Sequence, residues 1–225
     1  MGNSGNNAIE EYHAMNTEKR DFDKEAASWD ENPARVKLAH DVANAISKQI
    51  ALTPDMDVMD FGCGTGLLTV ELQPRVRSIT GIDSSQGMLD MFNTKIAKLK
   101  LNQVSTVLVD LDKGDILTGN YDLVVSNMTL HHIKEIEPLF DQFSAITAPA
   151  GYLCITDLDP DNGQFHADNT GVFHFGFARA TLRKIFIEAG FDKVNDITAA
   201  KVMKPAINGE MREFTVFLMT GQKIR

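Results

Sequence analysis

Three glycines on alternate residues, Gly62, Gly64 and Gly66, have the spacing in this sequence that most clearly indicates chemistry. An apolar run containing Val58 and Phe61 precedes them, and a helix-forming stretch follows at once. A strand, a tight turn and a helix start in this order bring bare backbone N–H groups against a nucleotide-like ligand. We expect the glycines to permit positive φ, to admit the ligand and to let helix and strand pack closely.

The residues around the glycines indicate which class of nucleotide-like ligand the loop binds. Asp60, at the carboxyl end of the expected strand, places a carboxylate beside a polar group in the crevice. Cys63 lies inside the turn as a small residue that fits there and is a candidate ligand contact. Dinucleotide-binding folds carry G-x-G-x-x-G, whose third glycine would stand at position 67, where this chain has Leu67. The D-x-G-x-G-x-G spacing therefore disfavours an NAD-dependent oxidoreductase.

A second group of polar residues follows the next strand of the chain. Asp83 stands roughly 20 residues past the glycine turn, where an acidic residue accepts hydrogen bonds from a ribose diol. We expect Ser84 to cap the following helix and to lie near the base. Met88, one turn into that helix, is a candidate contact for an adenine face.

The third and fourth strand ends carry further candidate contacts. Asp110 is expected to accept a hydrogen bond from the adenine exocyclic amine, and the backbone N–H of Leu111 to face a ring nitrogen. The fourth strand runs into Asn127, across the switch point from the glycine loop. Open α/β sheets bind ligands at this point, so Asn127 is also a candidate cofactor contact.

Three histidines are candidate general bases, because an unperturbed imidazole titrates near neutrality. His131 and His132 follow the fourth strand, and we expect only one of them to face the cavity while the other bonds backbone at a helix start. His174 lies in a Phe-, His- and Gly-rich segment, residues 163–177. The same segment holds four phenylalanines that either line an apolar acceptor site or pack in the core: Phe165, Phe173, Phe175 and Phe177.

The sequence does not predict a metal site. Asp157 and Asp159, after the fifth strand, are possible ligands, but no matching third ligand is evident. The two cysteines, Cys63 and Cys154, are far apart and form no C-x-x-C pair, so a disulfide framework or zinc site is not expected.

The four strand-end features, in this order, resemble the class I S-adenosylmethionine (AdoMet) dependent methyltransferases over about residues 22 to 220. The sequence is most similar to the small-molecule group that includes the ubiquinone and menaquinone C-methyltransferases. Members carry an acid-glycine loop like Asp60–Gly66, a ribose-binding acid like Asp83 and an adenine-side acid like Asp110. A Leu-His-His segment like Leu130–Ile133 often follows their fourth strand.

The resemblance implies AdoMet as cofactor and in-line methyl transfer to a small-molecule acceptor. It also implies that the segment with Trp29 covers the methionine end of the cofactor, as in similar proteins. Phe22 and Trp29 then either close the pocket as a lid or pack as the aromatic side of an amphipathic helix. Ser126–Thr129 departs from the Asn/Asp-Pro-Pro-aromatic run of enzymes that methylate exocyclic amines or glutamine amides, so that chemistry is not expected. A non-catalytic AdoMet- or S-adenosylhomocysteine-binding regulator and a tRNA or protein methyltransferase stay open as alternatives.

Composition agrees with a small-molecule enzyme. The chain has 225 residues, a net charge of −9 and a sequence pI of about 5.1, which opposes a general phosphate-binding surface and hence a nucleic-acid partner. No stretch approaches the ~18 to 20 apolar residues of a membrane span and no signal-peptide pattern opens the chain, so we expect a cytoplasmic protein. The sequence assigns no oligomeric state.

The strands and helices that position these residues alternate along the chain. This alternation predicts a doubly wound, Rossmann-like α/β fold with a mostly parallel seven-stranded sheet, helices on both faces and an antiparallel last strand. Helices are expected at 84–99, 135–147 and 178–189. Strands are expected at 56–61, 78–82, 104–109, 121–126, 151–156, 191–198 and 213–220.

The N-terminal part is expected to divide into a flexible arm, residues 1–20, and a helical lid, residues 21–52, of a single 21–225 domain. A helix is expected over Phe22–Asp30, and Asn32 with Pro33 should begin another that ends at Thr53–Asp55. Its core-facing stripe should comprise Val36, Ala39, Val42, Ala43, Ile46 and Ile50.

Overall fold

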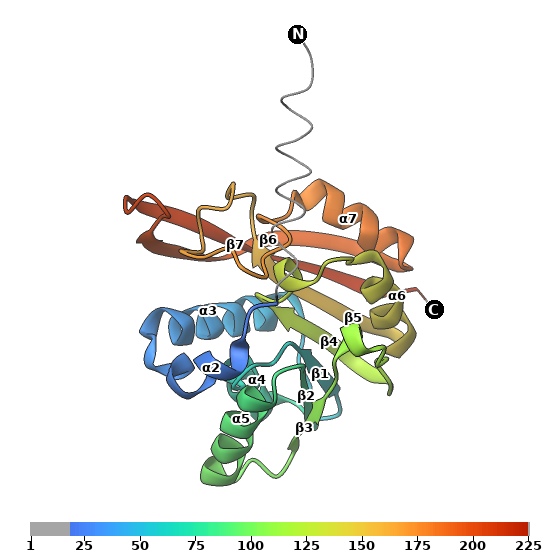
Figure 1. Cartoon of the computed structure of the whole chain (residues 1–225). Coiled ribbons are helices and arrows are strands. Elements are labelled where there is room, and N and C mark those ends of the chain that lie inside the picture. The colour runs from blue at the N-terminus through green and yellow to red at the C-terminus, as the bar shows by residue number, and fades with distance from the viewer. Residues whose placement is uncertain (1–18, 225) are drawn as a thin grey trace.

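The structure, a computed structural model, describes residues 19–224, so residues 1–18 of the expected N-terminal arm lie outside the described residues. Seven strands form one sheet in the order β3-β2-β1-β4-β5-β7-β6 (Figure 1). The strands are β1 (Asp57–Phe61), β2 (Ser78–Asp83), β3 (Val104–Leu108), β4 (Tyr121–Asn127), β5 (Thr147–Leu158), β6 (Phe191–Pro205) and β7 (Met211–Lys223).

The sheet confirms the expected direction of its strands. The first five strands pair in parallel, and β7 runs antiparallel to both β5 and β6. A short turn joins β6 to β7, as a hairpin requires. The carboxyl ends of β1 to β5 therefore meet at one edge of the sheet, where the strand order reverses between β1 and β4.

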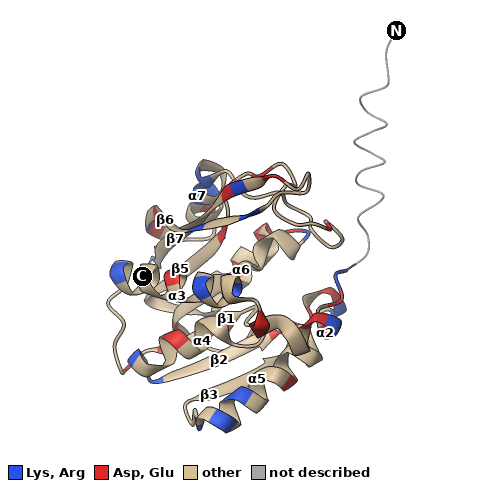
Figure 2. Cartoon of the chain, turned by 90° about the vertical axis from the view of Figure 1, so that its left-hand side faces the viewer, with Lys and Arg blue, Asp and Glu red and all other residues tan. Residues whose placement is uncertain are grey.

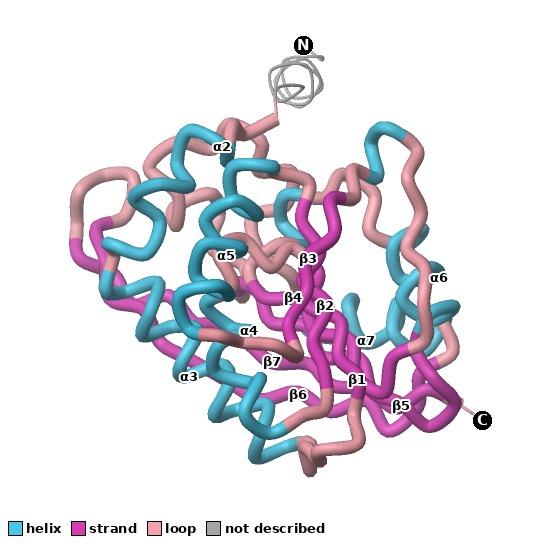
Figure 3. Tube along the Cα trace, turned by 90° about the horizontal axis from the view of Figure 1, so that it is seen from below, coloured by secondary structure: helices cyan, strands magenta, loops and turns pink. Residues whose placement is uncertain are grey.

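Helices cover both faces of the sheet (Figure 3), with α3, α4 and α5 on one face and α6 and α7 on the other. The larger helices and turns are α2 (Phe22–Glu25), η1 (Ala26–Glu31), α3 (Pro33–Gln49), α4 (Leu67–Leu72), α5 (Gln86–Leu99), η3 (Leu111–Lys113), η4 (Leu130–His132), α6 (Glu137–Ile146) and α7 (Arg179–Glu188).

Alternation along the buried strands produces the two large apolar clusters of the described residues, one on each face of the sheet. In β1, Met59 packs in the cluster beneath α6 and α7, and its neighbour Val58 packs in the cluster beneath α3, α4 and α5. Val124 and Val125 of β4 divide in the same way. Successive strand side chains point to opposite faces, so both faces of the central strands are apolar and the sheet is buried between helices.

Helix α3 begins as expected, because the Asn32 side chain accepts a hydrogen bond from the Ala34 N–H and Pro33 occupies the first turn. The helix ends at Gln49, earlier than expected, and Val36 is exposed, so the buried stripe starts only at Ala39. The stretch expected as one helix over 22–30 is instead the short α2 followed by the 3₁₀ turn η1. Helix α2 lies beside α5 (Figures 1 and 2).

Strands β6 and β7 are longer than expected because they continue as a two-stranded ribbon beyond β5. Pairing of β5 with β7 stops at Leu158 and Val216, whereas β6 and β7 stay paired through Lys204 and Arg212 to Pro205 and Met211. Charged residues in this ribbon hide the strand pattern in the sequence. No helix in the described residues is long and apolar enough to cross a membrane.

Candidate functional site

A single cavity of about 1290 Å³ opens at the carboxyl edge of the parallel strands. Pockets for one drug-sized ligand usually measure roughly 300 to 1,000 Å³, so this cavity has room for a cofactor and a small acceptor together. All but one of the site residues expected from the sequence line it. They are Trp29, Asp60, Gly62, Cys63, Gly64, Asp83, Ser84, Met88, Asp110, Leu111, Asn127, His131, His132 and His174.

The glycine loop after β1 presents backbone to the cavity at Gly64. This residue has φ +53°, and a Cβ there would meet only the Met88 sulfur, at 3.9 Å, within the protein. Gly66 differs from the expectation, because it does not line the cavity. It stands at the start of α4, where a Cβ would lie 2.1 Å from the Phe92 ring, so Gly66 permits packing of the loop against α5.

Asp83 joins the glycine loop to the start of α5. Its carboxylate accepts hydrogen bonds from the backbone N–H of Gly64, at 2.8 Å, and of Ser85, at 2.9 Å. Burial raises the pKa of Asp83 above its usual value, although these backbone bonds act in the opposite direction. Ser85, and not Ser84 as expected, caps α5 by accepting from the Met88 N–H; Ser84 is exposed at the cavity.

Asp60 is buried at the end of β1, with 1% of its surface exposed. The Thr69 hydroxyl donates a 2.6 Å hydrogen bond to it. Burial raises the pKa of Asp60 to about 7, with a smaller contribution from Asp83 and against the hydrogen bond from Thr69. The carboxyl group therefore changes charge near neutral pH and responds to any cation that enters the cavity.

Asp110 has a different environment, because it pairs with cations at the start of η3. Lys19 lies 2.9 Å and Lys113 3.2 Å from its carboxylate oxygens. Burial acts to raise the pKa of Asp110, but the hydrogen bonds from Lys19 and Lys113 outweigh it and hold the pKa below the usual value. Lys19, at the end of the expected flexible arm, therefore contacts the wall of the cavity.

Two aspartates that the sequence analysis did not single out attach the N-terminal segment to the site. Asp23 accepts hydrogen bonds from the Ser85 hydroxyl, at 2.5 Å, and from the Gly87 N–H, at 2.8 Å. Asp30 accepts a 2.6 Å hydrogen bond from the Thr65 hydroxyl and pairs with Lys95 at 2.7 Å. The α2–η1 segment is therefore fastened to the glycine loop and to α5.

The aromatic residues of this segment line the cavity between those two attachments. The Phe22 ring contacts Trp29 edge-on, with centroids 5.9 Å apart, and contacts His132 at 5.0 Å. The Arg35 guanidinium lies 3.6 Å from the Trp29 ring centroid. These contacts agree with the expected lid, whose closing role stays a prediction.

Both histidines that follow β4 line the cavity, which corrects the expectation that only one of them does. The 3₁₀ turn η4 turns the backbone so that the two rings lie side by side, with centroids 4.1 Å apart. His131 Nδ1 lies 2.8 Å from the Asp157 carboxylate, and His132 Nδ1 donates to the Gly171 carbonyl at 2.6 Å. Burial and the neighbouring His131 lower the pKa of His132 to about 3.

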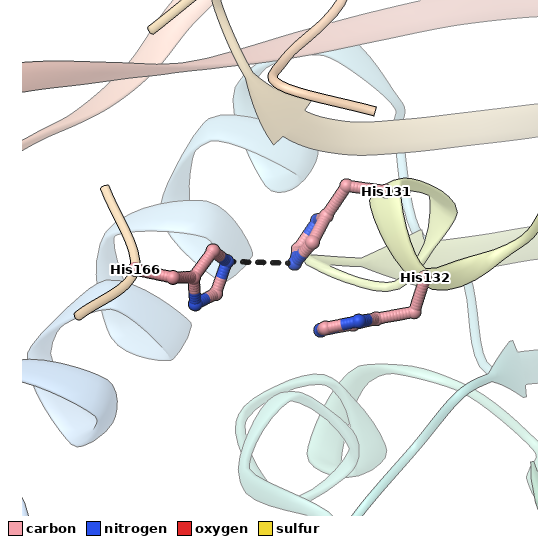
Figure 4. A group of neighbouring side chains, drawn as sticks. All are labelled: His131, His132 and His166. Carbon is pink, nitrogen blue, oxygen red and sulfur yellow. Dashed lines mark hydrogen bonds between the residues drawn. The ribbon is translucent and has the colours of Figure 1, made fainter. Parts of the chain in front are cut away.

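His166 is a site residue that the sequence analysis missed. Its Nε2 atom lies 3.2 Å from His131 Nε2 (Figure 4). Burial, together with His131 and His132, lowers the pKa of His166 to about 2. The available signal was a second histidine in the segment that also contains His174, whose Nε2 donates a 2.9 Å hydrogen bond to the Ile133 carbonyl.

Asp157, near the end of β5, and Asp159, just after that strand, do not act as a pair. Asp157 is fully buried and holds His131. Asp159 instead forms an ion pair with Arg179 at 2.7 Å and accepts from the Thr215 hydroxyl. Of the four phenylalanines in the 163–177 segment, three line the cavity and Phe177 packs in the core. The segment therefore contributes both to the cavity wall and to the core.

Comparisons with known proteins agree with this geometry. A family model described as a methyltransferase domain matches residues 34–195. An uncharacterised methyltransferase of Schizosaccharomyces pombe is 30% identical over 201 residues, which are 76% of this chain and 70% of that protein. A malonyl-[acyl-carrier protein] O-methyltransferase of Calditerrivibrio nitroreducens is 28% identical over 158 residues, which are 66% of this chain and 57% of that protein.

A solved structure shares the fold at low sequence identity. Phosphoethanolamine N-methyltransferase 2 of Haemonchus contortus, in complex with S-adenosyl-L-methionine, is similar with a TM-score of 0.65 and 16% identity, over 81% of this chain and 52% of that one. Because the methyltransferase model covers most of the chain and a methyltransferase relative is 30% identical over 76% of it, the chain belongs to the class I AdoMet-dependent methyltransferases.

Proposed function

We propose that this enzyme transfers the methyl group of AdoMet to a small acceptor that carries an anionic group and binds beside the cofactor in the same cavity. The observation that carries the proposal is the separation of charge along the cavity wall. Asp60, Asp83 and Asp110 line the cavity at the strand ends. Arg20, Arg35 and Lys204 line it near the Phe-rich segment, which contributes one acid of its own, Asp168.

The acidic half suits a cationic cofactor. Asp60 and Asp83 act on each other electrostatically and both line the cavity beside Gly64. AdoMet carries a positive sulfonium and an ammonium group, so Asp60 has a cation to pair with, and Asp83 has a ribose diol to accept from. Asp110, which pairs with Lys19 and Lys113, lies beside the adenine of the cofactor in this arrangement.

The basic half suits an anion. Glu25 binds Arg20 through both carboxylate oxygens, at 2.6 and 3.0 Å, and Arg35 at 3.5 Å, so one carboxylate serves two cations. Lys204, on β6, makes no ion pair in the described part of the chain, and its ammonium lies 4.3 Å from the Phe165 ring centroid. Burial, Arg35 and Arg20 lower the pKa of Lys204 and outweigh the opposite effect of Asp161, so an acceptor anion would offset the remaining repulsion.

The reaction is an in-line displacement. A lone pair of the acceptor attacks the methyl carbon, the bond from that carbon to sulfur breaks, and its electron pair stays on sulfur to give neutral S-adenosylhomocysteine. An anionic acceptor oxygen already has the lone pair available, so no general base is needed, and the protein contributes mainly orientation. The relative from Calditerrivibrio nitroreducens, named as an O-methyltransferase, supports oxygen as the attacked atom.

An acceptor panel tests the proposal. Formation of S-adenosylhomocysteine is measured with small carboxylates, phosphate esters and phenols, and with neutral amines, alcohols and thiols of similar size. The Lys204→Gln variant is compared with Lys201→Gln, since Lys201 lies on the same strand but is exposed and paired with Glu213 at 2.8 Å.

We expect turnover with anionic acceptors and at least a tenfold rise of the acceptor KM in Lys204→Gln, corresponding to loss of about one charge-assisted contact. Lys201→Gln should leave the KM unchanged. Turnover restricted to neutral acceptors would contradict the anionic class. Tight AdoMet binding without turnover on any acceptor, by contrast, would favour the regulatory alternative.

A further inference from the structure

Three imidazoles converge on the wall of the cavity, where the sequence gives no reason to expect a metal. His131 and His132 come from η4, and His166 comes from the loop after β5 (Figure 4). One nitrogen atom from each ring lies within 4.8 Å of the others. We propose that this histidine cluster, His131, His132 and His166, binds a divalent transition metal of the zinc type.

The spacing of the first pair fits a shared metal ion. Zinc binds imidazole nitrogen at about 2.0 to 2.1 Å in a tetrahedral arrangement, which separates two such nitrogens by roughly 3.3 Å. The Nε2 atoms of His131 and His166 are 3.2 Å apart. His132 then needs to move only a little, because its ligand nitrogen already lies within 4.8 Å of the ligand nitrogens of His131 and His166.

Hydrogen bonds at the opposite ring nitrogens prepare two of the rings as ligands. The Gly171 carbonyl can only accept a hydrogen bond, so the ring proton of His132 is on Nδ1. Its Nε2 atom is therefore unprotonated, and the lone pair of that atom can bind a metal. The buried Asp157 carboxylate does the same for His131 Nδ1, while also accepting from the backbone N–H groups of His131 and Leu158. A carboxylate or carbonyl behind a histidine is the usual outer contact of metal-ligating imidazoles.

The ligand chemistry selects the type of metal. Three imidazoles with no thiolate suit Zn²⁺, Co²⁺, Ni²⁺ or Cu²⁺, whereas Mg²⁺ and Ca²⁺ prefer oxygen ligands. All three histidines line the cavity, so the remaining coordination position faces the space for the acceptor. Three protein ligands with one open position are typical of sites where a metal binds substrate. A role in holding an acceptor oxygen rests on the proposed function, but metal binding does not.

Arg20 sets a condition on the site. Its guanidinium lies 3.4 Å from His166 Nδ1 and is held by Glu25. Binding of a metal at His166 Nε2 leaves the proton of that ring on Nδ1, so this long contact must break while the Arg20–Glu25 pair persists.

Titration with metal alone tests the proposal. Protein without a polyhistidine tag is treated with chelator, dialysed and titrated with Zn²⁺ by calorimetry and with Co²⁺ by visible absorption. We expect one equivalent to bind with micromolar or lower Kd, with the intense absorption of tetrahedral cobalt, and Zn²⁺ to displace the cobalt. S-adenosylhomocysteine binding is measured on every variant to show that its fold is intact.

Matched variants assign the ligands. His166→Gln, on a half-buried loop, and His132→Gln should each weaken Zn²⁺ binding at least tenfold, and Asp157→Asn about tenfold to a hundredfold through the orientation of His131. His174→Gln, on the same cavity wall, and His40→Gln, exposed on α3, should leave the Kd unchanged.

The metal site would be overturned if Zn²⁺ did not bind stoichiometrically, or if His166→Gln and His132→Gln left Zn²⁺ binding intact. His131 and His166 would then be only a hydrogen-bonded pair. Chelator-treated protein that transfers methyl groups at full rate but binds no Zn²⁺ would refute the metal site while the proposed function stands. Stoichiometric Zn²⁺ binding without turnover on any acceptor would support the site and count against the proposed function.

Discussion

The Asp83 carboxylate accepts a 2.8 Å hydrogen bond from the backbone N–H of Gly64. Asp83 is the last residue of β2, and Gly64 lies in the loop after the neighbouring strand β1, so one side chain holds the glycine loop in place. Its other oxygen accepts from Ser85, which fixes the start of α5. The carboxylate is therefore oriented before the cofactor arrives, and little ordering remains to be done on binding.

Removal of this carboxylate should weaken cofactor binding. We expect Asp83→Ala to raise the Kd for S-adenosylhomocysteine by about tenfold to a hundredfold, since hydrogen bonds to charged groups contribute about 1.5 to 3 kcal/mol. Isothermal titration calorimetry measures the change. Asp90→Ala, exposed on α5, is the control, and equal Kd values for the two variants would exclude Asp83 from the cofactor site.

Two glycine substitutions should separate binding from packing. Gly66→Ala brings a methyl group within 2.1 Å of the Phe92 ring, at a residue whose φ is +78°. We expect the clash to lower the free energy of unfolding by about 1 to 3 kcal/mol, in addition to the backbone cost of positive φ. Gly64→Ala has open space beside it and should cost about 1 to 2 kcal/mol through its positive φ, yet lose most cofactor affinity.

Thermal unfolding with and without S-adenosylhomocysteine distinguishes these effects. The ligand should still raise the Tm of Gly66→Ala but not that of Gly64→Ala. A normal ligand-induced rise in Gly64→Ala would mean that the cofactor does not approach this backbone.

The sequence was sufficient to predict the sheet and most of the cavity wall, because those features depend on local patterns. The glycine spacing, the acids at strand ends and the alternation of strands and helices are each visible within a few residues. The antiparallel β7 followed from a connection that lacks a helical pattern. The β6–β7 ribbon was not predicted, because its strands stay hydrogen-bonded through positions with charged side chains, such as Lys204 opposite Arg212.

The histidine cluster depends on contacts that no local pattern reveals. His166 meets His131 across 35 residues of chain, which include α6 and β5, and the loop after β5 that carries His166 has no regular period. Asp23 and Asp30 belong to no motif in the sequence, yet they fasten the N-terminal segment to α5 and to the glycine loop. Contacts between residues so far apart in the sequence can be identified only once the three-dimensional fold is known.

Cofactor affinity should depend on pH through Asp60. Its pKa is about 7 in the folded protein, and the cationic cofactor favours the deprotonated form, so AdoMet affinity should rise by about tenfold between about pH 6 and pH 8. Calorimetry across this range measures the rise. Asp60→Asn should flatten the profile, and an unchanged slope in that variant would assign the titration to another group.

The same group affects stability without ligand. The folded pKa lies above the usual value near 3.9 of an unfolded chain, so the folded protein holds a proton that the unfolded chain releases. Stability should therefore fall as the pH rises from about 4 to 7. Denaturant unfolding of Asp60→Asn should lack this fall, and a fall of equal size in wild type and variant would contradict it.

The N-terminal segment should report on cofactor binding through Trp29, the single tryptophan. We expect its fluorescence to change when S-adenosylhomocysteine binds. Asp30→Ala removes the attachments to Thr65 and Lys95 and should raise the KM for AdoMet several-fold. Fluorescence that does not respond to saturating ligand would show that the segment is not a lid.

His174 should act on the acceptor side alone. It lines the cavity and donates to the Ile133 carbonyl, away from the contacts of Asp83 and Gly64. We expect His174→Ala to lower the rate of methyl transfer while the Kd for AdoMet stays unchanged. Parallel loss of rate and affinity would indicate a structural role.

Hydrogen–deuterium exchange with and without saturating S-adenosylhomocysteine tests most directly where the cofactor binds. We expect slower amide exchange in residues 60–66 and 82–88, and unchanged exchange in the turn that joins β6 to β7, residues 206–210. Saturation of the protein with no protection of the glycine loop, or protection confined to another part of the chain, would contradict it.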